Sequence, residues 1–189
     1  MTFHSTPNPP HARYSQKPFP PYRFILGENP HPTADPAGHL YGKEEEDPGT
    51  LTLENWSTNE TYLYGVDLYN YAYWWEAHEA FEGLWREFPP VVIEAHFLQG
   101  LIKIAAAFYK WQLQDRRGVE IHYAGGAELL GEVAARHPVY MGLDLKDHLG
   151  KLEKQFKKVL GTQLPSDPEP QSTRWPDPLE DYPFIVLKQ

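Results

Sequence analysis

The chain has 189 residues, 23% of them charged and 41% hydrophobic, and a formal net charge of -9. This length suits one domain with a sizeable core, and the negative charge argues against nucleic acid or an anionic membrane surface as the main partner. No stretch approaches the roughly 20 apolar residues that span a bilayer. The chain has no cysteine and no signal-peptide pattern at its N-terminus, so we expect a cytoplasmic protein without disulfides.

Prolines divide the chain into three parts. The 19 prolines gather in residues 1–50 and 165–189 and are nearly absent between them. Proline fixes φ and removes a backbone donor, so these segments resist helix formation. The sequence therefore predicts a proline-rich arm, a folded domain and a second proline-rich arm, over residues 1–54, 55–162 and 163–189.

Both predicted arms also carry aromatic and aliphatic side chains, which are too apolar for purely solvated tails. We expect residues 18–27 to lie across the domain or a neighbouring subunit, whereas residues 1–15 are expected to be loose. In the C-terminal arm, Trp175 and residues 184–187 are expected to dock. The arms are thus the candidate route to a homo-oligomer.

Hydrophobic periodicity predicts five helices and no strand between the arms. The first begins near residues 57–59, and the second spans residues 74–86. The third, over residues 91–116, is apolar nearly all round, so it is expected to be the buried central helix. The fourth and fifth cover about residues 119–136 and 143–160. The fold class is therefore all-α, a single bundle of about five helices with irregular arms.

Turn-forming residues predict where these helices break. A break near Tyr71 or Ala72 separates the first two helices. The prolines at 89–90 end the second helix and, by the preference of proline for the first helical position, open the third. Residues 116–118 form the turn before the fourth helix, in which the small residues 124–127 permit close packing against a neighbour.

The second predicted helix carries a candidate site. It buries aromatic side chains on one stripe and places His78, Glu79 and Glu82 beside that stripe. On the third helix, Gln99 and Lys103 belong to a polar stripe on an otherwise apolar surface. If the two helices pack side by side, Glu79 and Glu82 face Gln99 and Lys103. We expect these four side chains to form a ligand-binding cluster, with no metal ion or cofactor.

Three further interpretations of the same residues stay open. A carboxylate beside apolar surface is suited to acid–base chemistry, so His78, Glu79 and Glu82 are catalytic candidates for an unassigned reaction. A salt-bridged network that fixes the helix register is the structural alternative. The third is a metal-dependent hydrolase with His78 and Glu82 as ligands and Glu79 as base, since His and Glu four residues apart nearly repeat the zinc-protease pattern. Other helices would then supply further ligands, with these candidates: Glu94, His96 and His122.

Several motifs together are similar to one known family. They are Tyr69-Asn70, Trp74-Trp75-Glu76-Ala77-His78-Glu79, Glu82, Trp85, Leu98-Gln99-Gly100-Leu101-Ile102 and, more weakly, Gly126-Ala127. Over residues 60–135 the chain resembles the prokaryotic domain-of-unknown-function family number three hundred and nine. It departs from that pattern at Ala72, where glycine is usual, and at Trp74, where tyrosine is usual.

The resemblance implies a small helical bundle of no agreed activity. It places the family's polar signature on these residues: Glu76, His78, Glu79, Glu82 and Gln99. From its place on the helix, Glu76 is expected to face solvent or an arm. The sequence thus indicates an uncharacterised helical-bundle protein with a candidate small-ligand site. A non-catalytic module whose arms bind a partner or a second copy is the alternative without a site.

Overall fold

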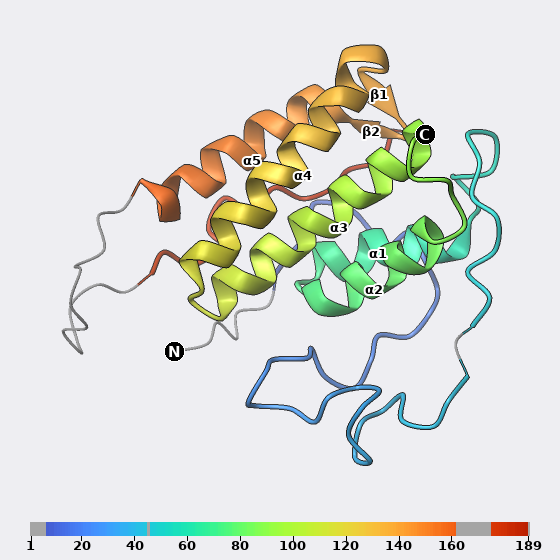
Figure 1. Ribbon diagram of the computed structural model, residues 1–189, viewed down its shortest axis with the longest axis vertical. Helices are drawn as coiled ribbons and strands as arrows, with labels where there is room; N and C mark the ends of the chain where they lie inside the picture. The colour runs from blue at the N-terminus through green and yellow to red at the C-terminus, as the bar shows by residue number, and fades with distance from the viewer. Residues whose placement is uncertain (1–6, 45, 162–174, 189) are drawn as a thin grey trace.

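A computed structural model describes residues 7–44, 46–161 and 175–188 of the chain. The described part confirms the predicted all-α class, with five helices and one short β-hairpin (Figure 1). Among these residues, no helix is both long and apolar enough to cross a membrane. The elements, in chain order, are α1 (Glu60–Asn70), α2 (Trp74–Trp85), α3 (Ile93–Gln112), α4 (Arg116–Arg136), β1 (Val139–Tyr140), β2 (Leu143–Asp144) and α5 (Leu145–Leu160).

Helix α3 lies at the centre of the bundle, as its apolar sequence predicts. It packs between α2 and α4, while α1 packs on α2 and α5 packs on α4 (Figure 1). Phe97, Phe108 and Trp111 of α3 are completely buried. Helices α2 and α4 therefore bury their apolar stripes against this rod, and Tyr62 of α1 and Phe156 of α5 also contact its aromatic rings.

Small residues allow α3 and α4 to approach closely. A Cβ atom on Gly100 would lie 2.7 Å from the Leu130 side chain, and one on Gly126 would lie 3.1 Å from the carbonyl oxygen of Gly100. Larger side chains at these two positions would push the helices apart. This confirms the close packing predicted for the fourth helix.

The break between α1 and α2 falls where the sequence predicts it. Helix α1 ends at Asn70, and Ala72 adopts a left-handed conformation with φ 62°. Glycine adopts this conformation at little cost, whereas alanine is strained in it. The family pattern, which has glycine at this position, matches this backbone requirement.

Two predicted helix boundaries are wrong for reasons of local hydrogen bonding. Residues 116–118 form the first turn of α4 because the Asp115 side chain caps it, accepting a hydrogen bond of 2.9 Å from the Gly118 N–H. The prolines at 89–90 do not open α3. The Val92 N–H bonds to the Pro89 carbonyl, and this turn delays the start of the helix.

The β-hairpin contradicts the expectation that the domain has no strand. Val139 pairs with Asp144 and Tyr140 with Leu143. A Cβ atom on Gly142, which has φ 79°, would lie 2.5 Å from the Trp56 ring. Strands of two residues are too short to show an alternating pattern, and this hairpin depends on tertiary packing instead.

A buried carboxylate of α1 anchors the N-terminal arm. Asp67 is completely buried, and its two oxygens accept hydrogen bonds from the backbone N–H groups of Tyr14 at 3.0 Å and Ser15 at 2.9 Å. Arg13 adds an ion pair of 3.3 Å. The expectation that residues 1–15 are loose is therefore wrong for residues 13–15, and residues 1–6 lie outside the described part.

The next segment of the N-terminal arm crosses α1 and α2, as predicted for residues 18–27. Phe19 packs against the rings of Tyr71 and Tyr73, and the Tyr64 hydroxyl donates to the Pro18 carbonyl at 2.9 Å. Phe24, five residues further on, is buried. The arm is thus part of the folded unit.

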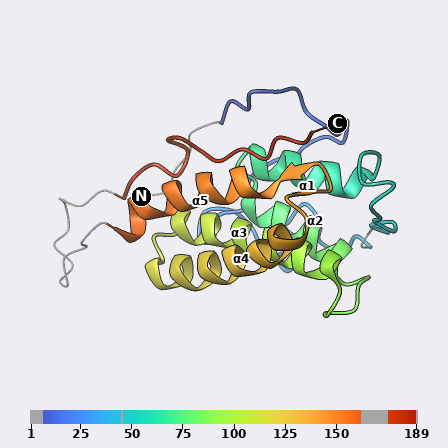
Figure 2. The same cartoon turned by 90° about the horizontal axis from the view of Figure 1, so that it is seen from above.

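The C-terminal arm docks between α1 and α5 (Figure 2). The Asn70 side chain accepts from the Ile185 N–H and donates to the Ile185 carbonyl, both at 2.8 Å. Trp175 and Leu187 are buried too, which confirms the predicted docking, whereas residues 163–174 lie outside the described ranges. The two arms meet where the Leu187 N–H donates to the Tyr14 hydroxyl at 2.8 Å.

Replacing Asp67 by asparagine is expected to lower the free energy of unfolding by about 3 kcal/mol, because an amide nitrogen cannot accept the arm's N–H groups. Urea unfolding followed by circular dichroism measures this change. Glu54→Gln, which removes an equal charge from an exposed side chain, is the control. Equal stability of the two variants would contradict the anchoring role of Asp67.

His148 of α5 makes the domain acid-sensitive. It is 1% exposed, and neither ring nitrogen has a partner among the described residues. Burial, with a smaller contribution from the charge of Lys151, lowers the pKa of His148 to about 4. The unfolded chain therefore binds more protons between pH 6.5 and 4, and stability falls as the pH drops through this range.

His148→Leu is expected to remove a pH-dependent loss on the order of 3 kcal/mol between pH 7 and pH 4. Urea unfolding at both pH values gives the difference between the variant and the unmodified protein. His137→Leu, at an exposed position, should leave the loss in place. The same pH dependence in both variants would show that another group causes it.

Candidate functional site

Helix α2 exposes its polar residues because its apolar stripe faces the core. The buried members of that stripe are Trp74, Ala77, Phe81 and Leu84. His78, Glu79 and Glu82 lie beside it, and their side chains are 31%, 42% and 28% exposed. The three candidate catalytic residues are thus half-buried at the surface of the bundle.

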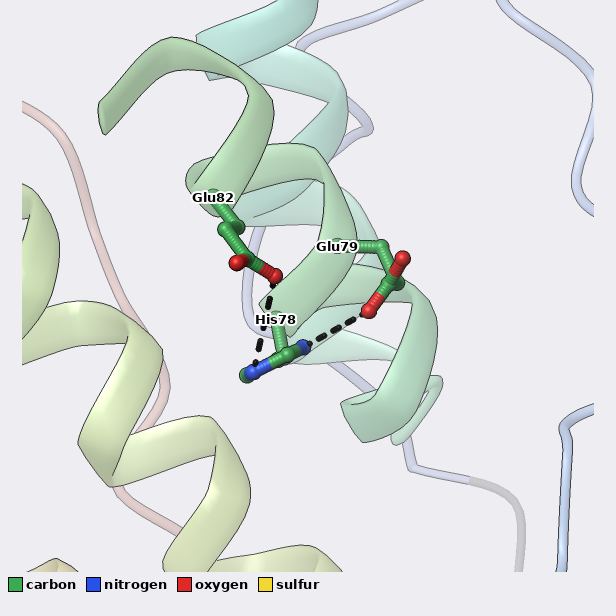
Figure 3. Close-up of side chains that lie close together, drawn as sticks. All are labelled: His78, Glu79 and Glu82. Atoms are coloured by element: carbon green, nitrogen blue, oxygen red, sulfur yellow. Dashed lines mark hydrogen bonds and ion pairs between the residues drawn. The ribbon is translucent and has the colours of Figure 1, made fainter. Parts of the chain in front are cut away.

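The structure brings these three side chains together. His78 Nδ1 lies 3.1 Å from Glu79 Oε1, and His78 Nε2 lies 4.0 Å from Glu82 Oε2 (Figure 3). One potential ligand atom from each residue lies within 4.8 Å of the other two. Together they form the α2 cluster, a set of donors suited to a divalent cation.

Hydrogen bonding gives the two carboxylates different roles. Glu79 contacts Nδ1, which favours the tautomer with its hydrogen on Nδ1 and leaves the Nε2 lone pair on the side of Glu82. The other oxygen of Glu82 pairs with Arg86 at 3.3 Å. One oxygen of Glu82 and one nitrogen of His78 therefore remain available to a common ligand.

Gln99 and Lys103 lie on the neighbouring helix α3 but do not bond to the α2 cluster. Both are half-buried, and within the described ranges no ion pair or hydrogen bond joins either to Glu79 or Glu82. The Lys103 side chain extends along α4 instead, with Nζ 3.4 Å from the place of a Cβ atom on Gly125. The predicted α2–α3 salt bridge is thus not formed there.

The other candidate ligands occupy different surroundings. His96 pairs with Glu132 of α4 at 2.9 Å. Burial raises the pKa of the Tyr140 hydroxyl, and the charge of Glu94 raises it as well. The pKa of His122 on α4 is lowered by burial and by the positive charges of Lys103 and Lys110. Among the described residues, none of the three candidates joins the α2 cluster.

Glu76 belongs to the family signature but not to the α2 cluster. It lies about 200° from His78 around the helix, is 5% exposed, and accepts a hydrogen bond of 2.7 Å from the Phe24 N–H. Its second oxygen has no partner among the residues described. Burial raises the pKa of Glu76 to about 7, and the bond from Phe24 opposes this shift. Of its two predicted surroundings, solvent or an arm, Glu76 takes the arm.

The sequence analysis did not predict the partners of two carboxylates on α2. Arg86 lies four residues after Glu82, and this spacing alone would have indicated their ion pair. Phe24 lies 52 residues before Glu76. No sequence pattern links positions so far apart, so only the tertiary structure identifies that bond.

Glu76→Gln is expected to stabilise the protein at pH 8 and to change little at pH 5. The raised pKa means that the folded state binds more protons than the unfolded state, so this carboxyl group favours folding at low pH and loses that contribution as the pH rises to about 7. An amide carries no charge at either pH. Thermal unfolding at both pH values tests the prediction, and destabilisation at pH 8 would contradict it.

Comparison with known proteins finds one family model that matches part of the chain. The family model described as Domain of unknown function (DUF309) matches residues 62–121, a range that includes the α2 cluster, Gln99 and Lys103. No curated protein and no solved structure matches the chain. The match confirms the resemblance predicted from the motifs. Over residues 62–121, this chain is similar to the family Domain of unknown function (DUF309).

Proposed function

We propose that the protein binds a small ligand through a divalent metal ion held by His78 and Glu82. The observation that supports this most is the distance of 4.0 Å between His78 Nε2 and Glu82 Oε2. Two ligand atoms on one zinc ion lie roughly 3 to 4 Å apart. A small side-chain rotation is therefore enough to place a cation between them.

Glu79 would act on the metal ion through His78. Its carboxylate contacts Nδ1, the nitrogen that does not face Glu82. A carboxylate in this place fixes the ring orientation and makes the imidazole a stronger ligand. Glu79 is accordingly a positioning residue, although its own oxygen is close enough to become a third ligand.

The ligand would complete the coordination shell. Two ligands from one helix leave positions open, and the half-exposed side chains leave them accessible to a small molecule. Gln99 on the neighbouring helix α3 is the predicted member whose amide could add an oxygen. A mixed set of nitrogen and oxygen donors suits Zn²⁺, Mn²⁺ or Fe²⁺.

Hydrolysis is the second candidate function. An open position on a metal ion can bind and activate water. Glu79, the most exposed carboxylate of the α2 cluster, would then be the base, as the zinc-protease pattern suggests. The interaction module stays a prediction: in this chain Phe19 and Trp175 of the arms pack on their own bundle.

Untagged protein is expected to carry about one equivalent of divalent metal, measured by mass spectrometry, and the His78→Ala, Glu82→Ala double variant is expected to carry none. Glu79→Gln should weaken Zn²⁺ binding about tenfold or more in calorimetric titrations, because it removes the partner of the imidazole. His137→Ala, which removes an exposed histidine from outside the site, is the control. Equal metal content in all proteins would refute the proposal.

A further inference from the structure

The polar stripe of α3 is incompletely paired. It consists of His96, Gln99, Lys103 and Lys110. At its ends, His96 pairs with Glu132 at 2.9 Å and Lys110 pairs with Asp115 at 3.0 Å. Gln99 and Lys103, in the middle, have no such partner in the part of the chain that the structure describes. Helix α3, which carries both residues, packs between α2 and α4 (Figure 1).

Lys103 is held in a specific place without an acidic partner. A Cβ atom on Gly125 would lie 3.3 to 3.5 Å from the Cδ, Cε and Nζ atoms of Lys103. The absence of a side chain at Gly125 therefore makes room for the lysine against α4. A half-buried ammonium group loses part of its hydration, and an anion beside it compensates for that loss.

His122 lies one turn before Gly125, on the same face of α4. Its Nδ1 is buried and has no partner among the described residues. Burial and then the charges of Lys103 and Lys110 lower the pKa of His122, whereas Asp115 opposes this shift. Lys103 thus packs against α4 one turn from His122, and neither side chain forms an ion pair with an acid in the part of the chain that is described.

We infer that Lys103 and His122 bind an anionic group, a phosphate or a carboxylate, on the ligand that reaches the metal ion at His78 and Glu82. This inference rests on the proposed function and adds the chemical class of the ligand. The site takes one part from each of three helices: the metal ligands from α2, the ammonium group from α3 and the imidazole from α4. Helix α3 packs against both α2 and α4, so the three parts lie on neighbouring helices.

The partners match the chemistry of an anion. Lys103 supplies an ammonium group with three donors, and His122 supplies a ring N–H. Hydrogen bonds from charged donors to phosphate or carboxylate oxygens are the stronger kind, so removal of the lysine charge has a measurable effect on affinity. Gln99, one turn before Lys103 in the polar stripe of α3, offers both a donor and an acceptor to the remainder of the ligand.

The test titrates inorganic phosphate and, separately, acetate into the metal-free full chain by calorimetry. One phosphate or acetate ion is expected to bind per chain, and Lys103→Met is expected to weaken that binding at least about tenfold. Lys110→Met, which removes a lysine of the same stripe that already has a partner, is the matched control and should change affinity less than about twofold. Lys103→Arg should retain most of the affinity because it keeps the charge.

A second measurement places the anion relative to the metal ion. Mn²⁺ bound to the full chain is expected to shorten the ³¹P relaxation time of phosphate, and His122→Phe is expected to reduce this effect while Mn²⁺ affinity stays the same. If Mn²⁺ does not bind, the proposed function is wrong, and the metal-free titrations still decide the roles of Lys103 and His122. No binding of either anion, or equal binding to the Lys103→Met and Lys110→Met variants, would overturn the inference.

Discussion

The arms depend on hydrogen bonds between their backbone and buried polar side chains of the bundle. Proline-rich segments cannot pair all their backbone groups with one another, and buried groups without partners are costly. Asp67, Asn70 and Glu76 supply the missing partners to residues near Tyr14, Ile185 and Phe24. Because both arms are fixed in this way on α1 and α2, they extend the core and cover the side of the bundle that lies away from α4.

Helix α2 contributes side chains to two different surfaces because successive residues point in different directions around a helix. Glu76 and His78 are two residues apart, so they point to sides about 200° apart. On one side, the buried carboxyl group of Glu76 binds the arm and has a raised pKa. On the other, the half-exposed His78 and Glu82 lie close enough for one cation. Burial therefore separates an anchoring carboxylate from one that a ligand can reach, although the two belong to one family motif.

Among the described residues, the polar stripe of α3 is paired at its two ends and unpaired in the middle. His96 and Lys110 form ion pairs with acids of α4 and of the turn before it. Lys103 rests beside Gly125, and His122 keeps an unpartnered nitrogen. The acidic α2 cluster and Lys103, which has no ion pair among the described residues, thus lie on neighbouring helices. Side chains of opposite charge that do not pair with each other suit a ligand with both a metal-binding and an anionic group.

The sequence by itself determined the helices, the central position of α3, the break at Ala72 and the candidate residues of α2, because these follow from local periodicity and backbone conformation. It did not determine where α4 begins, because that is decided by a single hydrogen bond from the Gly118 N–H to the Asp115 side chain. The hairpin at Gly142, the bond from Phe24 to Glu76 and the place of Lys103 beside Gly125 were decided only by the tertiary structure. Each depends on contacts between segments distant in the chain, and no local pattern encodes which of them meet.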